Sequence, residues 1–269
     1  MKPAKFAYER PRTVEAVVAL LAQAENAKIL AGGQTLGPML NLRLAQPDLI
    51  IDITRIGELA RLDMDADTVT LGACVTHSAV EDGRASDFSG GFLSKVAGGI
   101  AYRAVRNRGT LGGSIAHADP SADWPSCFMA LGATVLIAGA GGERETPIAD
   151  FVRGALDCDL AADEMITAIR LPRLSAKARC GFAKICRKEG EFADAIGVYV
   201  RDPERGIERL VAGAVGGKPL VADAPGLAAG ADLAAMTGIL QRCGYVGDHY
   251  DTQIHAVALQ RAVGEAFAA

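Results

Sequence analysis

The sequence predicts an α+β fold in two domains. The chain has 269 residues, more than the roughly 150 of an average domain, and its 50% apolar and 22% charged residues suffice for a large buried core. Prolines and basic residues interrupt the pattern over 172–179, so we place a boundary there and assign residues 1–175 and 176–269 to the two domains. Three strand-like segments followed by helical ones after this boundary are typical of a small α+β domain.

The first domain mixes helical and strand-like segments. Thr13 can cap a helix whose apolar residues recur at helical spacing, namely Val14, Val17, Val18 and Leu21. Short apolar runs predict strands at 28–30, 48–53, 68–71, 133–138 and 165–171. Helices are expected over 75–100, over 125–131 and briefly after Pro147. Residues 106–125 are rich in glycine and small polar side chains and show no helical period, which predicts a loop.

The second domain is predicted to hold three strands and two helices. The strands are expected over 181–187, 196–201 and 208–215, and the helices over 231–243 and 251–266. Four apolar residues share one face of the first of these helices, namely Leu233, Met236, Ile239 and Leu240. This face is expected to pack on the strands.

Charge and motifs exclude several functional classes. The 28 Lys and Arg against 32 Asp and Glu leave a net charge of −4, which lacks the basic footprint of nucleic-acid binding. No apolar run approaches the 18 or so residues of a membrane span, and the first twelve residues lack the apolar core of a signal peptide, which favours a cytoplasmic protein. Residues 139–144 do not complete a dinucleotide fingerprint, and residues 216–219 do not complete a phosphate-binding loop.

No metal site is expected on this chain. The six cysteines show no C-x-x-C spacing and are interpreted as reduced, mostly buried thiols, so an iron–sulfur cluster is not expected either. The four histidines are too scattered along the sequence for a metal-binding set, and we interpret them as structural.

Two glycine-rich segments are the candidate chemistry. Residues 31–36 and 110–114 each combine a glycine pair with a hydroxyl and offer consecutive backbone N–H groups to an anion. One such segment alone is more typical of a tight turn, but two in one domain favour a cofactor with two phosphates. Asp123 is then a candidate acceptor for ribose or ribityl hydroxyls, or alternatively the N-cap of the helix that follows it.

Three segments resemble the FAD-binding medium subunit of the molybdenum hydroxylases, the family of xanthine dehydrogenase and, most nearly, of bacterial carbon monoxide dehydrogenase. They are 28–36 (KILAGGQTL), 41–47 (NLRLAQP) and 106–120 (RNRGTLGGSIAHADP). The resemblance covers essentially the whole chain. It implies a two-subdomain FAD-binding domain of the vanillyl-alcohol-oxidase (PCMH) type, followed by a small α+β domain with a three-stranded antiparallel sheet and helices.

The resemblance also implies which residues contact FAD. The glycine-rich segments would grip the pyrophosphate, with Thr35 standing where the family more often has serine, and Asp123 matches the family's acidic contact. Ile100 and Ile166 would pack against the cofactor rings, and Phe192 lies on a segment that could cover the isoalloxazine. The full implied set is Ile29, Leu30, Ala31, Gly32, Gly33, Gln34, Thr35, Leu36, Ile100, Thr110, Leu111, Gly112, Gly113, Ser114, Asp123, Ile166, Lys184 and Phe192.

An electron-transfer role follows from the resemblance. In family members a large subunit carries the molybdenum cofactor, a small subunit carries two iron–sulfur clusters, and the flavin subunit passes electrons to NAD, a quinone, oxygen or another external acceptor. The chain is therefore expected to bind FAD in a dimer of heterotrimers, with no acid–base catalytic residue of its own.

Two alternatives stay open. A stand-alone FAD oxidase of the same fold would need a substrate pocket with its own base, and the sequence indicates none. A flavin-free structural subunit would be expected to have lost one of the glycine-rich segments, and both are intact.

Overall fold

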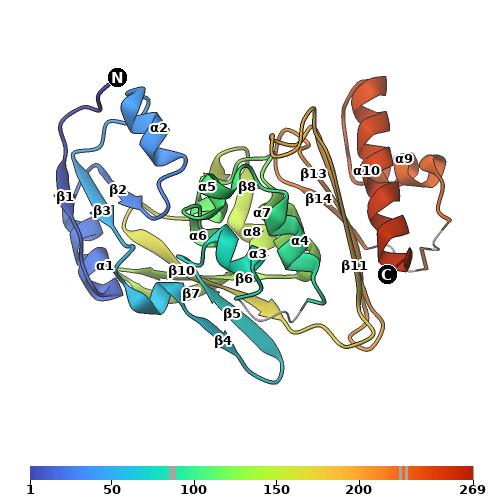
Figure 1. The fold of residues 1–269 in the computed structure, drawn as a ribbon, viewed down its shortest axis with the longest axis horizontal. Coiled ribbons are helices and arrows are strands. Elements are labelled where there is room, and N and C mark those ends of the chain that lie inside the picture. Colours follow the sequence, from blue (N-terminus) through green and yellow to red (C-terminus); the bar gives the residue numbers. More distant parts are fainter. Residues whose placement is uncertain (85–88, 224–225, 228–229, 269) are drawn as a thin grey trace.

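The computed structural model describes residues 1–84, 89–223, 226–227 and 230–268. Three main β-sheets follow one another along the longest axis of the molecule, from the N-terminal strands at the left of Figure 1 to the C-terminal helices at the right. The architecture is mixed α+β, as predicted. Within the described residues, none of the helices combines the length and the apolar character that crossing a membrane requires.

The N-terminal subdomain is a parallel three-stranded sheet with two helices. Its strand order is β1-β3-β2, and Thr13 caps the first helix as predicted, because its side chain accepts a hydrogen bond from the Ala16 N–H at 3.3 Å. The first glycine-rich segment connects β2 directly to the second helix. The elements are β1 (Ala7–Glu9), α1 (Val14–Gln23), β2 (Ala27–Leu30), α2 (Leu36–Asn41) and β3 (Leu49–Asp52).

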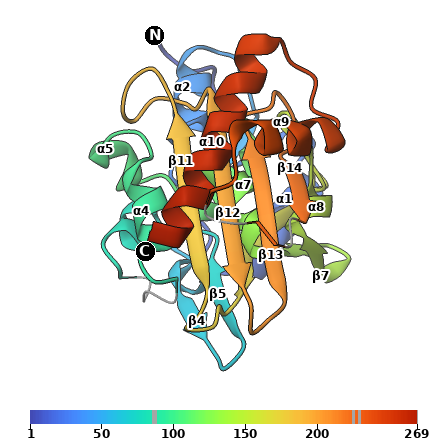
Figure 2. The same ribbon diagram turned by 90° about the vertical axis from the view of Figure 1, so that its right-hand side faces the viewer.

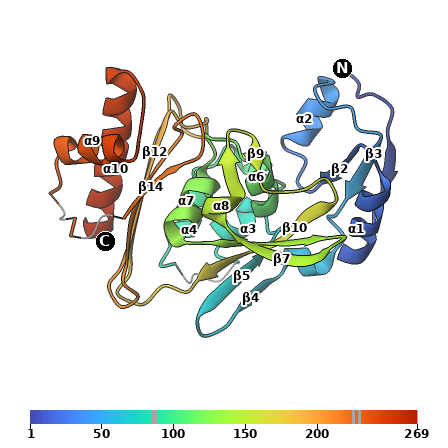
Figure 3. The ribbon, with the colours of Figure 1, turned by 180° about the vertical axis from the view of Figure 1, so that it is seen from behind.

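The central subdomain is an antiparallel five-stranded sheet in the order β4-β5-β10-β6-β7, with short helices gathered over it (Figures 1 and 3). Its strands are β4 (Leu62–Met64), β5 (Thr68–Gly72), β6 (Thr134–Gly139), β7 (Gly142–Pro147) and β10 (Glu164–Pro172). Its helices are η1 (Gly57–Ala60), α3 (His77–Glu81), α4 (Phe92–Gly98), α5 (Arg103–Arg106), α6 (Leu111–His117), α7 (Asp123–Leu131) and α8 (Ile148–Phe151), and a small ribbon joins β8 (Val152–Gly154) to β9 (Asp157–Cys158).

Two predictions for this subdomain need correction. The helix expected over 75–100 is two helices, α3 and α4, and residues 85–88 of that stretch lie outside the described residues. The loop expected over 106–125 contains helix α6, because Thr110 caps it and Leu111 and Ile115 bury one side of it. A single pair of apolar residues is too short a pattern to reveal a helical period.

The C-terminal sheet is antiparallel, in the order β11-β12-β13-β14, and has four strands rather than the predicted three. The missed strand is only four residues long and follows Pro219 closely, so it offers too few alternating residues to be recognised. Residues 173–178 connect this sheet to β10. The elements are β11 (Arg179–Ile185), β12 (Ala195–Asp202), β13 (Ile207–Gly213), β14 (Leu220–Asp223), α9 (Leu233–Arg242) and α10 (His249–Ala268).

The C-terminal sheet lies between α7 on one face and α10 on the other (Figures 1 and 2). Glycines permit the close approach of α10, because a Cβ at Gly197 would lie 2.3 Å from the Ala258 carbonyl oxygen. On the other face every residue of α7 is buried, and residues of β11, β12 and β13 complete the hydrophobic core of the central subdomain. The central sheet and the C-terminal sheet therefore share one core.

Candidate cofactor site

The first glycine-rich segment lies against residues 108–109, which come just before the second one, although the two are far apart in sequence. A Cβ at Gly32 would lie 2.1 Å from the carbonyl oxygen of Arg108, so only glycine allows this contact. The carbonyl oxygen of Gly32 in turn accepts hydrogen bonds from Nε of Arg108 at 3.2 Å and from the side-chain amide of Gln34 at 3.1 Å. Arg108, which no sequence pattern singles out, therefore joins the first segment to the residues just before the second one.

The first segment presents free backbone donors. The N–H groups of Gly32, Gly33, Gln34 and Thr35 donate to no acceptor among the described residues. Gly33 has a φ of +71°, in the left-handed region that lets successive N–H groups converge on an anion. An anion site at these N–H groups stays a prediction, and their lack of acceptors among the described residues is compatible with it.

The second segment is built differently from the first, although the sequence predicts matching ones. Its backbone is hydrogen-bonded to the connection between β5 and α3, because the Leu111 N–H donates to Val75 and the Gly112 N–H donates to Ala73. A Cβ at Gly112 would lie 2.5 Å from the Cβ of Ala73, so this glycine serves packing. Gly113 is exposed, and its Cβ would meet only the Thr110 hydroxyl, at 2.9 Å.

Asp123 and Lys184 form a buried ion pair between the central subdomain and the C-terminal sheet. Asp123 is the first residue of α7 and Lys184 lies on β11, and their side chains are 6% and 10% exposed. The lysine Nζ lies 3.2 Å from each carboxylate oxygen, but its hydrogen-bond geometry suits only Oδ2, which leaves Oδ1 without a hydrogen-bond partner among the described residues. Burial raises the pKa of Asp123, and Lys184 opposes this shift.

The N-cap alternative for Asp123 is wrong. Ala122 occupies the N-cap position of α7, and no side-chain hydrogen bond caps the helix there. The carboxylate of Asp123 is therefore held in a buried position with one oxygen free for a hydrogen-bond donor from outside the chain.

His77 contacts Trp124, the residue after Asp123, and the backbone of Gly109, just before the second glycine-rich segment. Its Nδ1 accepts a hydrogen bond from the Trp124 indole N–H at 3.1 Å, across 47 residues of sequence. A Cβ at Gly109 would lie 2.8 Å from its Nε2, so the ring packs directly on that backbone. The role is structural, as interpreted from the sequence, and burial together with the charge of Arg106 lowers the pKa of His77 to about 4.

Acid is expected to destabilise the protein through His77. Between pH 6.5, the ordinary pKa of histidine, and about pH 4, His77 is protonated in the unfolded chain but neutral in the folded chain. The free energy of unfolding therefore decreases as the pH falls from 6.5 to about 4. The full loss is about 3 kcal/mol. Urea unfolding of wild type and His77→Asn at several pH values measures it. The variant should have a flatter profile between pH 6.5 and 4, and equal slopes would contradict the assignment.

The other predicted contacts occupy varied positions. Ile29 and Leu30 are half-buried at the end of β2, Ile100 is half-buried after α4, and Ile166 lies in the main core on β10. Phe192, by contrast, is 71% exposed. The structure thus assembles the glycine-rich segments, His77 and the Asp123–Lys184 pair into one region.

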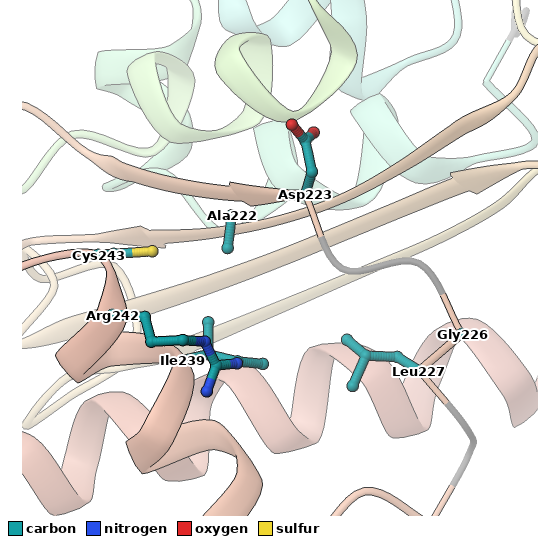
Figure 4. Close-up of a pocket in the computed structure, with 7 residues that line it drawn as sticks. All are labelled: Ala222, Asp223, Gly226, Leu227, Ile239, Arg242 and Cys243. Atoms are coloured by element: carbon teal, nitrogen blue, oxygen red, sulfur yellow. The ribbon is translucent and has the colours of Figure 1, made fainter.

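A separate cavity of about 440 Å³ lies between β14 and α9 and contains none of the predicted cofactor residues (Figure 4). Its lining residues are Ala222, Asp223, Gly226, Leu227, Ile239, Arg242 and Cys243. Within the described ranges, no group of three potential metal ligands occurs there or elsewhere.

Comparison with known proteins identifies the family. Residues 4–174 match the FAD binding domain in molybdopterin dehydrogenase. The chain belongs to this family. A curated relative, the nicotine 6-hydroxylase medium subunit of Paenarthrobacter nicotinovorans, is 34% identical over 237 residues, which cover 87% of this chain and 83% of that protein. The carbon monoxide dehydrogenase medium chain of Hydrogenophaga pseudoflava is 37% identical over 196 residues, covering 72% and 68%.

The molybdopterin dehydrogenase fold extends over the whole chain. A solved structure of carbon monoxide dehydrogenase from Hydrogenophaga pseudoflava aligns with a TM-score of 0.91 and 33% identity, over 100% of this chain and 99% of that one. A carbon monoxide dehydrogenase from Oligotropha carboxidovorans aligns with a TM-score of 0.90 and 29% identity. The chain is accordingly an FAD-binding subunit of the molybdenum-containing dehydrogenases.

The described residues fit the cofactor of this family. The free N–H groups of residues 32–35 suit phosphate oxygens, which are strong acceptors. The unpartnered Oδ1 of Asp123 suits a hydroxyl donor, because a buried carboxylate oxygen without a partner is costly. FAD offers both kinds of group in one molecule.

Proposed function

We propose that the chain is the electron-transfer subunit of a molybdenum hydroxylase complex. In this proposal a large molybdenum subunit oxidises the substrate, and a small subunit delivers electrons through its iron–sulfur clusters to the FAD of this chain, from which an external acceptor takes them. Two such heterotrimers form a dimer. The relatives support this role, because they are the medium subunit of a nicotine 6-hydroxylase and the medium chain of a carbon monoxide dehydrogenase.

The proposed binding mode uses the residues assembled above. The N–H groups of Gly32 to Thr35 hold the pyrophosphate, and the surface at Gly113 leaves room beside it. Asp123, held by Lys184, accepts a hydroxyl of the ribose or ribityl chain. Ile100, Ile166 and Phe192 line the rings. We assign residues 1–175 to an FAD-binding domain of the vanillyl-alcohol-oxidase (PCMH) type and residues 176–269 to the C-terminal domain of the subunit.

The bound FAD would supply the exchange between one-electron and two-electron carriers. The chain's own residues would hold the cofactor in place and fix the position of its contacts. The stand-alone oxidase is disfavoured because the three buried titratable side chains described in this region already have partners: Lys184 pairs with Asp123, and Trp124 donates to His77. The flavin-free alternative is disfavoured by the free donors at residues 32–35.

Purification of the complex from its native source tests the proposal. We expect the chain to co-purify with a molybdenum subunit and an iron–sulfur subunit, and its flavin absorption to bleach when substrate reduces the complex and to return with an external acceptor. A colourless chain that does not take up added FAD would refute the proposal. Oxidation of an organic substrate by the isolated flavin-loaded chain would favour the stand-alone oxidase.

A further inference from the structure

Arg106 is bonded through all three of its guanidinium nitrogens. Nε and Nη2 donate to the two carboxylate oxygens of Glu81, at 2.8 and 2.9 Å. Nη1 donates to the carbonyl oxygens of Ile100 and Ala101, at 2.9 and 2.8 Å. The side chain is only 12% exposed, and Arg106 lowers the pKa of Glu81 through these hydrogen bonds. The planar guanidinium group therefore forms a rigid connection between the Glu81 carboxylate and the two carbonyl groups. Because the group is planar, arginine loses little conformational freedom with each hydrogen bond it forms.

The peptides that Arg106 holds have an unusual conformation. Ala101 has a φ of +43°, a left-handed conformation that is uncommon for alanine. This conformation costs about 1 kcal/mol or more, so surrounding contacts must offset the cost. Both carbonyls of the turn point to the same guanidinium nitrogen. The hydrogen bonds from Arg106 therefore help to hold the peptides of Ile100 and Ala101 in this conformation.

A second segment rests on this turn. Gly190 has a φ of +82°, and a Cβ there would lie 2.9 Å from the Ala101 carbonyl oxygen. The Nζ of Lys188 also lies 5.8 Å from the centre of the Tyr102 ring. The turn that precedes Phe192 thus contacts the same peptide that Arg106 holds.

We propose that Arg106 is a positioning residue for the cofactor site, which fixes Ile100 directly and the turn before Phe192 through the Ala101 peptide. Glu81 orients the guanidinium group of Arg106, and this group in turn orients the carbonyl groups of Ile100 and Ala101. The consequence for FAD rests on the proposed function, since Ile100 and Phe192 are proposed ring contacts. The mechanical coupling from residue 106 to residue 190 does not depend on it.

Arg103 provides a matched control on the same helix. It pairs with the same carboxylate, since its Nη1 lies 2.7 Å from Glu81 Oε2, and also with Asp82 at 2.7 Å. It reaches neither carbonyl of the turn and is much more exposed than Arg106. Arg106→Lys and Arg103→Lys both keep the positive charge and lose the guanidinium group. Only Arg106→Lys removes hydrogen-bond donors to the carbonyl groups of Ile100 and Ala101.

Amide hydrogen exchange of the full chain without flavin tests the coupling. We expect Arg106→Lys to speed exchange about tenfold in peptides covering 100–102 and 188–192, while Arg103→Lys leaves both at wild-type rates. Glu81→Gln should give a smaller change in the same peptides. Unchanged exchange at 188–192 in Arg106→Lys would overturn the coupling. A rise that extends equally to β12 would overturn it too, since that is general destabilisation.

FAD titration with the visible circular dichroism of bound flavin tests the consequence for the site. We expect Arg106→Lys to bind FAD about tenfold more weakly and to change the flavin spectrum, and Arg103→Lys to match wild type. Wild-type affinity and spectrum in Arg106→Lys would overturn the role at the cofactor. If the wild-type chain itself binds no FAD, the proposed function fails, and the exchange experiment still judges the coupling.

Discussion

Gly113→Val is expected to abolish FAD retention in a chain that still folds. Gly113 is exposed, and an added Cβ would meet only the side-chain oxygen of Thr110, which caps α6, so we expect the variant to lose about 1 kcal/mol of stability and still fold. The valine methyl groups would occupy the open surface where the proposed pyrophosphate approaches the backbone. We expect at least about a hundredfold loss of affinity, which corresponds to about 2.7 kcal/mol. Flavin titration of the purified variant measures it.

Gly112→Val is the matched control, and we expect its main effect to be a loss of folding stability. The new side chain would collide with Ala73, whose Cβ lies 2.5 Å from the position that a Cβ at residue 112 would take. Overpacking of this kind costs about 1–3 kcal/mol, so the urea midpoint should fall. If Gly113→Val kept its flavin, or if the two variants were equally stable, the distinct roles assigned to the two glycines would be wrong.

Asp123→Ala is expected to cost both stability and cofactor. It leaves the ammonium of Lys184 in a site where that side chain is 10% exposed, and removing one partner of a buried ion pair typically costs about 3–5 kcal/mol. It also removes the free Oδ1 that the proposed hydroxyl of FAD would use. Urea unfolding and flavin titration measure the two losses separately.

A double variant separates the two effects of Asp123. Asp123→Ala with Lys184→Met removes the unpaired charge, so most of the stability should return while FAD binding stays weak. Recovery of full affinity in the double variant would mean that the carboxylate makes no contact with the cofactor. A single variant as stable as wild type would contradict the buried ion pair.

Local sequence features predicted the local parts of this structure well. Thr13 caps α1 as its position indicates, and the glycines at 32 and 33 form the expected set of free donors, because both depend on residues near them in sequence. The different roles of Gly112 and Gly113 could not be predicted. They depend on Ala73, which reaches Gly112 only through the folded β5–α3 connection.

The residues that join distant segments were the ones missed. Arg108 contacts Gly32 across 76 residues, and His77 contacts Trp124 across 47, and neither spacing leaves a pattern in a single sequence. Helix α6 and strand β14 were missed for another reason, since each is too short to display a period. The family resemblance implied Asp123 and Lys184 as separate cofactor contacts, and the ion pair between them became visible only in the structure.

The shared core of the central and C-terminal sheets makes helix α7 depend on the C-terminal half of the chain. Every residue of α7 is buried, and residues of β11, β12 and β13 belong to the core that includes α7. A nascent chain that has emerged only to residue 174 therefore exposes the apolar side of this helix and leaves Asp123 without Lys184. We therefore expect a chain cut after residue 174 to be less stable and more prone to aggregate than the 269-residue chain.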